Sequence, residues 1–295
     1  MQTAIEIQKP GGVEQIQVVQ KSIPMPQADE VLIRVEATGV AFADVVMREG
    51  LYPEVPAKAL TPGYDVVGVI ERVGAKVTDR QPGERVLALT RTGGYAQFAL
   101  AKAALLVPCP VDIPAAEAVA LVLNYVTAYQ MLVRIARVRA GDCVLVHGPT
   151  GGVGEALVQF GNLFGCKVYG TVSQRKLQQL ANPPGFIPLH YQQQPFEKVL
   201  KEMEPDGVDA VFDAIGGHHL KRSYEALSQG GKVVTYGMST AIENGRRNLL
   251  RALSGIARSL FVPVNLLADS KGVHGYNIWN LANAKPEWFQ QDLQR

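Results

Sequence analysis

A chain of 295 residues is long enough for about two domains, each with its own hydrophobic core. Its composition, 47% hydrophobic and 19% charged, is typical of a globular protein that folds in water. The formal net charge is only +2 and no long run of Lys or Arg occurs, so nothing favours nucleic acid as a partner.

The N-terminal segment Met1–Glu6 resembles a short strand rather than a secretory signal. The longest apolar region, 115–133, is interrupted by polar residues and is expected to fall short of a membrane-spanning helix. The three cysteines form no C-x-x-C pair, which favours buried, reduced thiols. We therefore expect a cytoplasmic protein without an integral membrane segment.

Up to about residue 110, short alternating apolar runs are separated by Gly and Pro turns, a pattern that predicts a compact β-rich domain. Strands are predicted at 31–37, 66–73 and 85–89. From Pro114 the periodicity becomes helical, with Asp112 as the candidate N-cap residue.

From residue 143, strands and helices alternate, which predicts an α/β fold with a doubly wound parallel sheet. Strands are predicted at about 143–147, 167–172, 187–191, 208–214, 232–236 and 273–278. Helices are predicted at about 153–164, 175–181, 196–203, 218–228 and 246–260.

The first strand of this second half leads into a glycine-rich turn, 148–154, that opens a helix. Glycines let the backbone approach a pyrophosphate, and a helix N-terminus favours negative charge. Gly151 and Gly154 hold the last two places of G-x-G-x-x-G while Pro149 holds the first, so a tight turn without a nucleotide remains an alternative. Small residues such as Gly216 and Gly237 follow later strands, which strengthens the cofactor interpretation.

The next strand ends without the Asp or Glu that would bind a ribose 2′-hydroxyl. Ser173, Arg175 and Lys176 stand there instead, and a hydroxyl with two cations suits a 2′-phosphate. The sequence therefore favours NADPH over NADH, although Lys176 would also be ordinary as a solvated residue in the first turn of a helix.

Four spaced motifs resemble the medium-chain dehydrogenase/reductase superfamily, in its zinc-independent quinone-oxidoreductase (zeta-crystallin-like) division: Glu49–Pro53, Thr61–Asp65, Pro82–Val86 and Gly151–Gly154. Three further segments look like the vesicle amine transport protein branch: Leu123–Tyr129, Gly231–Met238 and Arg247–Leu249. The resemblance implies a β-rich GroES-like domain at 1–123 and a Rossmann domain that binds NADPH at 124–280. It also implies, at 281–295, the start of a segment that returns to the first domain.

By analogy with this family, the chain would be an NADPH-dependent reductase that transfers a hydride to a quinone or an α,β-unsaturated carbonyl. Gly151, Gly152 and Val153 would hold the pyrophosphate, and Ser173, Lys176 and Tyr191 the 2′-phosphate. Thr127, Gly237 and Met238 would lie at the nicotinamide end. Packing alone is the alternative role for Tyr191.

Zinc-dependent members of the superfamily carry a Cys near position 41, a Gly-His-Glu in place of Gly63–Asp65, and a cluster of four cysteines. This chain has Ala41, no His before His147 and no cysteine cluster, so no metal site is expected. His218 and His219 are expected to form a solvated helix start.

Tyr52 is the candidate hydrogen-bond donor to the substrate carbonyl, because it falls on the cleft-side loop that the family uses; an aromatic cover of the core is the alternative. Ala41 and Tyr64 are expected to line the substrate pocket. Since Ala41 stands where many quinone reductases carry Asn, Asn124 is the candidate replacement for that polar group.

A catalytically weak NADPH-binding adaptor or sensor in membrane trafficking or lipid handling is the main alternative function, since a pocket without donors would bind cofactor yet reduce little. A Rossmann-type methyltransferase would leave the preceding β-rich domain unexplained. The resemblance implies a homodimer, with strand 273–278 pairing with its copy at the sheet edge. The final segment is expected to leave the first domain incomplete and less stable than in a longer relative, because it ends without a helix cap.

Overall fold

The structure, a computed structural model, describes residues 1–52, 55, 59–179, 185–243, 246–248 and 261–295. The chain divides into two compact units. Unit 1 is built mainly from Met1–Val126 and Ile278–Arg295, and unit 2 mainly from Thr127–Glu243 and Asn248–Asn277. Unit 1 therefore combines the two ends of the chain, and each unit is described here by itself.

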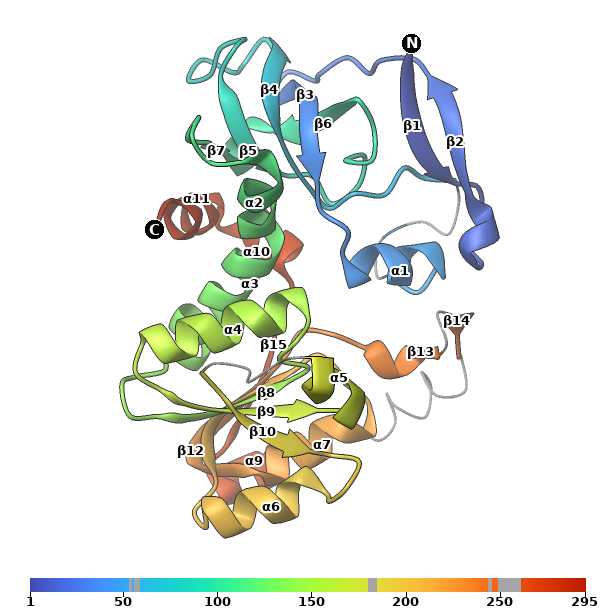
Figure 1. Ribbon diagram of the computed structural model, residues 1–295. Coiled ribbons are helices and arrows are strands. Elements are labelled where there is room, and N and C mark those ends of the chain that lie inside the picture. The colour runs from blue at the N-terminus through green and yellow to red at the C-terminus, as the bar shows by residue number, and fades with distance from the viewer. Residues whose placement is uncertain (53–54, 56–58, 180–184, 244–245, 249–260) are drawn as a thin grey trace. The chain divides into compact units, whose positions relative to one another are not determined.

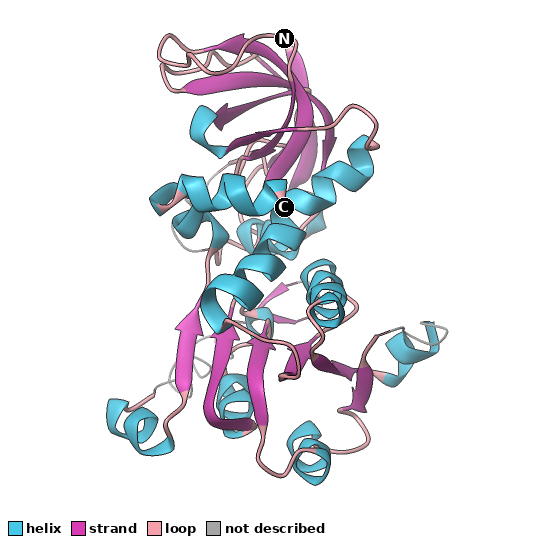
Figure 2. Ribbon diagram, turned by 90° about the vertical axis from the view of Figure 1, so that its left-hand side faces the viewer, coloured by secondary structure: helices cyan, strands magenta, loops and turns pink. Residues whose placement is uncertain are grey.

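Unit 1 contains a five-stranded antiparallel sheet in the order β6-β3-β4-β5-β7, drawn as the curved group of strands in Figure 2. Alternate residues of these strands point inward and form the core, which includes Val31, Ile33, Val66, Ile70 and Val86. The strands are β3 (Glu30–Thr38), β4 (Asp65–Val73), β5 (Arg85–Leu89), β6 (Phe98–Lys102) and β7 (Leu106–Pro108). The strands predicted at 31–37, 66–73 and 85–89 are confirmed.

The remaining elements of unit 1 surround this sheet. A separate antiparallel pair joins β1 and β2, and the C-terminal helix α11 packs against β7 and η2. The bounds are β1 (Gln2–Ile7), η1 (Val13–Gln15), β2 (Ile16–Lys21), α1 (Phe42–Arg48), η2 (Ala103–Leu105), α10 (Ile278–Ala284) and α11 (Pro286–Gln294).

One helical run, Ala115–Ala136, carries the chain out of unit 1. Its parts are α2 (Ala115–Ala120), the π-helical η3 (Leu121–Tyr125), α3 (Val126–Tyr129) and the π-helical η4 (Gln130–Ala136). The predicted N-cap at Asp112 is wrong: Pro114 occupies that position, since proline disfavours helical geometry in the residue before it. The run ends at Arg137, whose φ of 59° is left-handed.

By length and composition this run of 22 residues, with a mean hydropathy of 1.4, is long and apolar enough to cross a membrane, contrary to the expectation from its polar residues. Inside the protein, 56% of its most apolar window is buried. A core helix that packs inside its own protein passes the same test, so the finding is weak evidence for a membrane span.

Unit 2 contains a six-stranded parallel sheet in the order β10-β9-β8-β11-β12-β15. The order reverses between β8 and β11, which is the arrangement of doubly wound nucleotide-binding sheets. Helix α4 lies on one side of the sheet, and α6 and α7 lie on the other (Figure 1). Tyr169, Phe196 and Leu227 are among the residues of the core.

The strands of unit 2 are β8 (Cys143–His147), β9 (Lys167–Val172), β10 (Ile187–His190), β11 (Val208–Asp213), β12 (Leu227–Thr235), the short β13 (Ile242–Glu243) and β15 (Gly272–Gly275). The short strand β14 (Arg246–Arg247) belongs to unit 1. The helices are α4 (Gly152–Leu163), α5 (Gln174–Gln179), α6 (Phe196–Met203), α7 (His218–Glu225), η5 (Ser239–Ala241) and α9 (Pro263–Asp269). The predicted alternation is confirmed from β8 to α7.

Beyond α7 the predictions are less accurate. The strand predicted at 273–278 ends at Gly275, because Tyr276 turns inward to donate its hydroxyl to Gln130 and Ile278 begins α10. Of the helix predicted at 246–260, residues 246–247 form a strand instead and 249–260 lie outside the described residues. Helix α9 was not predicted.

Candidate functional site

The turn between β8 and α4 places an open helix N-terminus at the end of the first strand of the sheet. Gly151 is the N-cap residue of α4 and offers no side-chain cap, and Gly151 and Gly152 are both exposed. A Cβ atom on Gly154 would lie 2.0 Å from the Gly148 carbonyl oxygen, so the third glycine permits close packing of helix and turn. The backbone N–H groups at this end of α4 are therefore available to an anion.

Two buried hydroxyls have no hydrogen-bond partner among the described residues of the chain. They belong to Thr150, inside the same turn, and to Thr127 in α3. Buried polar groups are normally paired, so each unpaired hydroxyl calls for an explanation. A bound ligand with polar atoms would supply the missing partners, and Thr127 was predicted at the nicotinamide end of the cofactor.

The ends of β9 and β10 bring together residues that are 18 positions apart in the sequence. His190 pairs with Val172, so Tyr191 and Ser173 follow directly on neighbouring parallel strands. The Ser173 hydroxyl accepts a hydrogen bond from the Lys176 backbone N–H at 3.4 Å and caps α5, while the Lys176 side chain is exposed. Tyr191 is 50% exposed.

Arg175 is exposed on the same first turn of α5. The Gln174 backbone N–H donates to Oε1 of Gln192 at 3.1 Å, which ties the two strand ends together. The cations and the hydroxyl predicted for a 2′-phosphate therefore lie at one corner of the sheet.

The ends of β11 and β12 also pack closely through glycines. Gly216 has a φ of 70° and donates its N–H to Asp213 Oδ1 at 2.8 Å. A Cβ on Gly237 would lie 2.4 Å from the Ala214 carbonyl oxygen. Met238 is 42% exposed beside them. These residues hold two loops against each other at the edge where the ligands of open parallel sheets bind.

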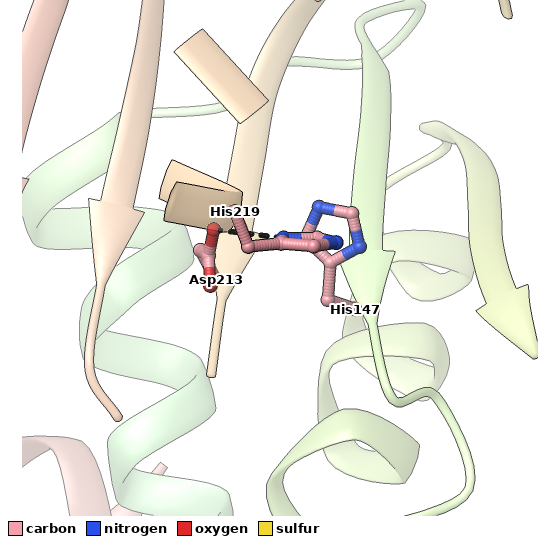
Figure 3. A group of neighbouring side chains, drawn as sticks. All are labelled: His147, Asp213 and His219. Atoms are coloured by element: carbon pink, nitrogen blue, oxygen red, sulfur yellow. Dashed lines mark hydrogen bonds and ion pairs between the residues drawn. The ribbon is translucent and has the colours of Figure 1, made fainter. Parts of the chain in front are cut away.

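Beneath these loops lies a buried cluster that the sequence did not reveal, formed by His147, Asp213 and His219 (Figure 3). His219, expected to be solvated, has a side chain only 11% exposed and its Nδ1 lies 3.3 Å from Asp213 Oδ2, so that expectation is wrong. Helix α7 turns this ring inward against His147, with ring centroids 4.3 Å apart. The neighbouring His218 is exposed.

The cluster is organised around the Ser223 hydroxyl. Ser223 Oγ donates to Asp213 Oδ2 at 2.7 Å and lies 3.0 Å from His147 Nε2. A neutral His147 that carries its proton on Nε2 donates to Ser223 and accepts from Thr171 Oγ1, 2.9 Å from Nδ1. His147, Asp213, His219 and Ser223 each have a hydrogen-bond partner within this cluster.

Burial decides the charge states in this cluster. It lowers the pKa of His147 to about 3, which keeps the ring neutral. Burial alone would raise the pKa of Asp213, but the hydrogen bond from His219 and the neighbouring rings outweigh it and hold that pKa below its ordinary value. An ionised Asp213 thus accepts the backbone N–H groups of Ile215 and Gly216 and fixes the loop that follows β11.

Unit 1 contains a pocket of about 270 Å³ between the end of β3 and the helices α2 and η3. Ala41 and Asn124, both predicted to serve the substrate, line it. Most of the other lining side chains are small and apolar; the polar ones include Thr38 and Asp65. Asn124 lies in the π-helical turn η3, a type of irregularity that is frequent at functional sites.

Asp65 is 3% exposed, and its Oδ1 accepts a hydrogen bond from the Gly39 N–H at 2.9 Å. Burial, opposed by that hydrogen bond and reinforced by the nearby Asp44 carboxyl, raises the pKa of Asp65 to about 7. Asp44 is also buried, and burial raises its pKa, but it accepts from Ala41 N, Gly63 N and the Tyr95 hydroxyl. Because its pKa is raised to about 7, the Asp65 carboxyl holds a proton up to near neutral pH.

The predicted donor Tyr52 and the predicted pocket residue Tyr64 contact each other. Their hydroxyl oxygens are 2.8 Å apart and their rings meet edge to face. Tyr64 is 1% exposed, and neither ring is among the residues that line the pocket. Ala41 and Asn124 thus line the same pocket, whereas Tyr52 and Tyr64 form a separate contact in unit 1.

Sequence models of two protein families match the chain. The alcohol dehydrogenase GroES-like domain matches residues 27–111, and the zinc-binding dehydrogenase family matches residues 152–258. The chain is 36% identical to mouse quinone oxidoreductase over 264 residues, which are 87% of this chain and 80% of the mouse protein. The chain belongs to the medium-chain dehydrogenase/reductase superfamily. Its β-rich unit has the GroES-like fold and its parallel sheet the Rossmann fold of that superfamily.

Two further comparisons agree with this assignment. The synaptic vesicle membrane protein VAT-1 homolog of zebrafish is 32% identical over 276 residues, and the match covers 91% of this chain but only 56% of the zebrafish protein. The native structure of a mycobacterial protein complexed with NADPH superposes with a TM-score of 0.84 at 29% identity, covering 100% of this chain and 88% of that one. The chain therefore spans little more than half of the zebrafish relative's length.

The residues present do not fit the zinc that one family description names. Ala41 offers no ligand atom, the Tyr64 hydroxyl is paired with Tyr52, and Asp65 supplies a single carboxyl group. Among the described residues, one group has metal-ligating atoms that lie close together: His147, Asp213 and His219. These atoms already take part in hydrogen bonds within the cluster, which include bonds to Ser223.

Proposed function

We propose that the chain is an NADPH-dependent, zinc-independent oxidoreductase that transfers a hydride to a quinone or an α,β-unsaturated carbonyl. The observation that carries this proposal is the corner formed by β9 and β10, where Ser173 and Tyr191 directly follow paired strand residues and Lys176 lies in the first turn of α5; none of these three residues is acidic. A ribose 2′-phosphate would find cations and hydroxyls there, whereas a 2′-hydroxyl would find no carboxylate.

The other residues have roles that follow from their position. The open N-terminus of α4 at Gly151, Gly152 and Val153 would hold the pyrophosphate. Thr127, whose buried hydroxyl lacks a partner, would bind at the nicotinamide end, and Gly237 and Met238 would border the same ring. When bound, the cofactor supplies the hydride, and the protein supplies alignment.

In unit 1, the pocket with Ala41 and Asn124 would hold the substrate, and the Asn124 amide is the proposed donor to its carbonyl oxygen. Tyr52 is a second candidate donor, with its hydroxyl held by Tyr64. Fixed donors of this kind stabilise the negative charge that develops on the oxygen during hydride transfer.

The test is NADPH oxidation, followed by absorbance, over a panel of quinones and enones, together with the ratio of NADPH to NADH affinity. Turnover with a preference for NADPH supports the proposal, and a preference for NADH contradicts it. Tight NADPH binding without turnover of any compound supports the alternative function, an NADPH-binding adaptor or sensor in membrane trafficking or lipid handling. The absence of a polar side chain at Ala41 and the VAT-1 relatives favour that alternative.

We further propose a cytoplasmic homodimer that takes a small molecule as its substrate and has neither a nucleic-acid partner nor an integral membrane segment. The quinone oxidoreductase relatives support the small-molecule substrate. The position of β15 at one edge of the parallel sheet supports the dimer, since no described strand pairs with its outer edge.

A further inference from the structure

The pocket of unit 1 is small and nearly apolar. Its volume of about 270 Å³ lies just below the usual range for ligand pockets, roughly 300–1,000 Å³. Alanine, glycine and valine side chains form much of its wall, so a compact, uncharged molecule fits it better than a phosphorylated or zwitterionic one. Asp65 and Asn124 are the lining residues able to exchange or direct a proton at a carbonyl compound.

Asp65 differs from a salt-bridged buried carboxylate, because among the described residues no cation contributes to its pKa. The described ionisable group that acts on its pKa is Asp44, from α1, and Asp65 in turn raises the pKa of Tyr95, in the loop before β6; neither neighbour brings positive charge. The residues of α2 and η3 in the pocket wall carry no charge. A carboxyl in such surroundings keeps its proton near neutral pH and can give it to a neighbour.

We propose that Asp65 is the catalytic acid of this pocket, and that the substrates are small α,β-unsaturated ketones or aldehydes whose α-carbon takes its proton. This inference rests on the proposed function, because it needs hydride delivery to the β-carbon. It adds to that function the source of the proton and the substrate class.

The step balances as follows. The β-carbon gains the hydride, the electron pair of the C=C bond moves onto the carbonyl group as an enolate, and the α-carbon then receives the proton of Asp65. The O–H bond of Asp65 breaks as a C–H bond forms, and water restores the proton to the carboxylate. The enone is reduced by two electrons and the nicotinamide is oxidised by two.

A quinone makes a different demand on the protein. Its reduction places protons on oxygen atoms, which exchange with water without an enzymic acid, whereas protonation of carbon is slow and benefits from a positioned acid. Loss of Asp65 should therefore slow enone reduction far more than quinone reduction, whereas a merely structural role would slow both alike.

The experiment compares wild type, Asp65→Asn and the exposed control Asp79→Asn with NADPH, using 2-methylcyclohex-2-enone and p-benzoquinone as substrates. We expect Asp65→Asn to lower kcat for the enone by about 100-fold or more, the usual contribution of a general acid, and to lower kcat for the quinone at least tenfold less. The exposed control Asp79→Asn should keep the wild-type rates with both substrates. The enone product of wild type should have one configuration at the α-carbon, and that of Asp65→Asn should be a mixture.

A readout without turnover keeps the test independent of hydride transfer. Infrared difference spectra of the free protein, wild type minus Asp65→Asn, should show a protonated carboxyl at pH 6 that is lost as the pH rises above about 7. Equal enone rates and stereochemistry in wild type and Asp65→Asn would overturn the inference, as would an ionised Asp65 at pH 6. Wild-type turnover of quinone but not of enone would also overturn it while leaving the proposed function intact. Failure of wild type with both substrates would instead reject the function itself.

Discussion

Thr127 carries a buried hydroxyl that has no partner among the described residues, and such a group costs about 1–3 kcal/mol. Replacement by valine keeps the shape and removes the cost. We expect Thr127→Val to raise the melting temperature of the cofactor-free protein and to weaken NADPH binding severalfold, because the cofactor loses a partner. Calorimetry and fluorescence titration measure the two effects.

Thr171 is the matched control, since its hydroxyl lies 2.9 Å from His147 Nδ1 and is satisfied in the free protein. Thr171→Val should lower the melting temperature. If Thr127→Val destabilised the free protein as much as Thr171→Val does, the assignment of Thr127 to the cofactor would be wrong.

Lys176 is exposed in the first turn of α5, so its removal should not disturb the core. An ion pair with a 2′-phosphate would contribute on the order of 1.5–3 kcal/mol. We therefore expect Lys176→Ala to weaken NADPH binding by roughly 10- to 100-fold and to leave NADH binding unchanged. Isothermal titration with both cofactors tests this, with the exposed Lys198→Ala as control. Equal losses for NADPH and NADH would contradict the role.

At the scale of elements, the turn before α4 contains two glycines that differ in how much space a side chain would have. A Cβ on Gly154 would lie 2.0 Å from the Gly148 carbonyl oxygen, whereas on Gly151 the nearest atom is 3.6 Å away. Gly154→Ala should therefore destabilise the fold, because the backbone must shift. Gly151→Ala should fold normally and lose NADPH affinity, because its methyl group takes space that the pyrophosphate would use.

Thermal unfolding and NADPH titration of both variants separate packing from binding. A Gly151→Ala variant that binds NADPH as wild type does would place the pyrophosphate elsewhere.

The buried cluster links β8, β9, β11 and α7, and it makes stability depend on pH. In the unfolded chain a histidine is protonated below its ordinary pKa of about 6.5, whereas His147 in the folded protein resists protonation down to about 3. The unfolded state therefore binds more protons in this window, and stability falls as the pH falls from about 6.5 towards 3, by about 1.4 kcal/mol per pH unit.

Urea unfolding between pH 7.5 and 4 measures this slope. His147→Gln should have a lower free energy of unfolding than wild type at pH 7.5. That free energy should fall less steeply with decreasing pH, because the contribution of one titrating proton is lost. The exposed His218→Gln should keep the wild-type slope. Identical slopes for all three proteins would show that His147 does not control this dependence.

For the whole molecule, the proposed dimer places β15 beside its copy. A Cβ on Gly275 meets no atom within 4 Å, so the chain itself tolerates a side chain there. Gly275→Glu would bring like charges together across a two-fold axis, and we expect sedimentation velocity to show monomers at micromolar concentration. Gly275→Ala should remain dimeric. A wild-type protein that sediments as a monomer at every concentration would reject this interface.

Local sequence patterns predicted the parallel sheet well because its strands are short apolar runs between clear helices. The same reasoning failed where partners from distant segments decide the structure. Tyr276 leaves the strand direction because Gln130, from a helix far away in sequence, accepts its hydroxyl. His219 is largely buried because Asp213 and Ser223 contact its ring, although His218 beside it in sequence is exposed.

By itself, the sequence determined the order of strands and helices, the glycine turn and the basic residues after β9, because periodicity, glycine geometry and charge are local properties. Only the tertiary structure decided which of these groups meet. Strand register joined Ser173 with Tyr191, and the packing of β3 against α2 and η3 created the pocket around Asp65 and Asn124. Burial then set the protonation of Asp65 and His147, since the cost of desolvating a charge depends on everything packed around it.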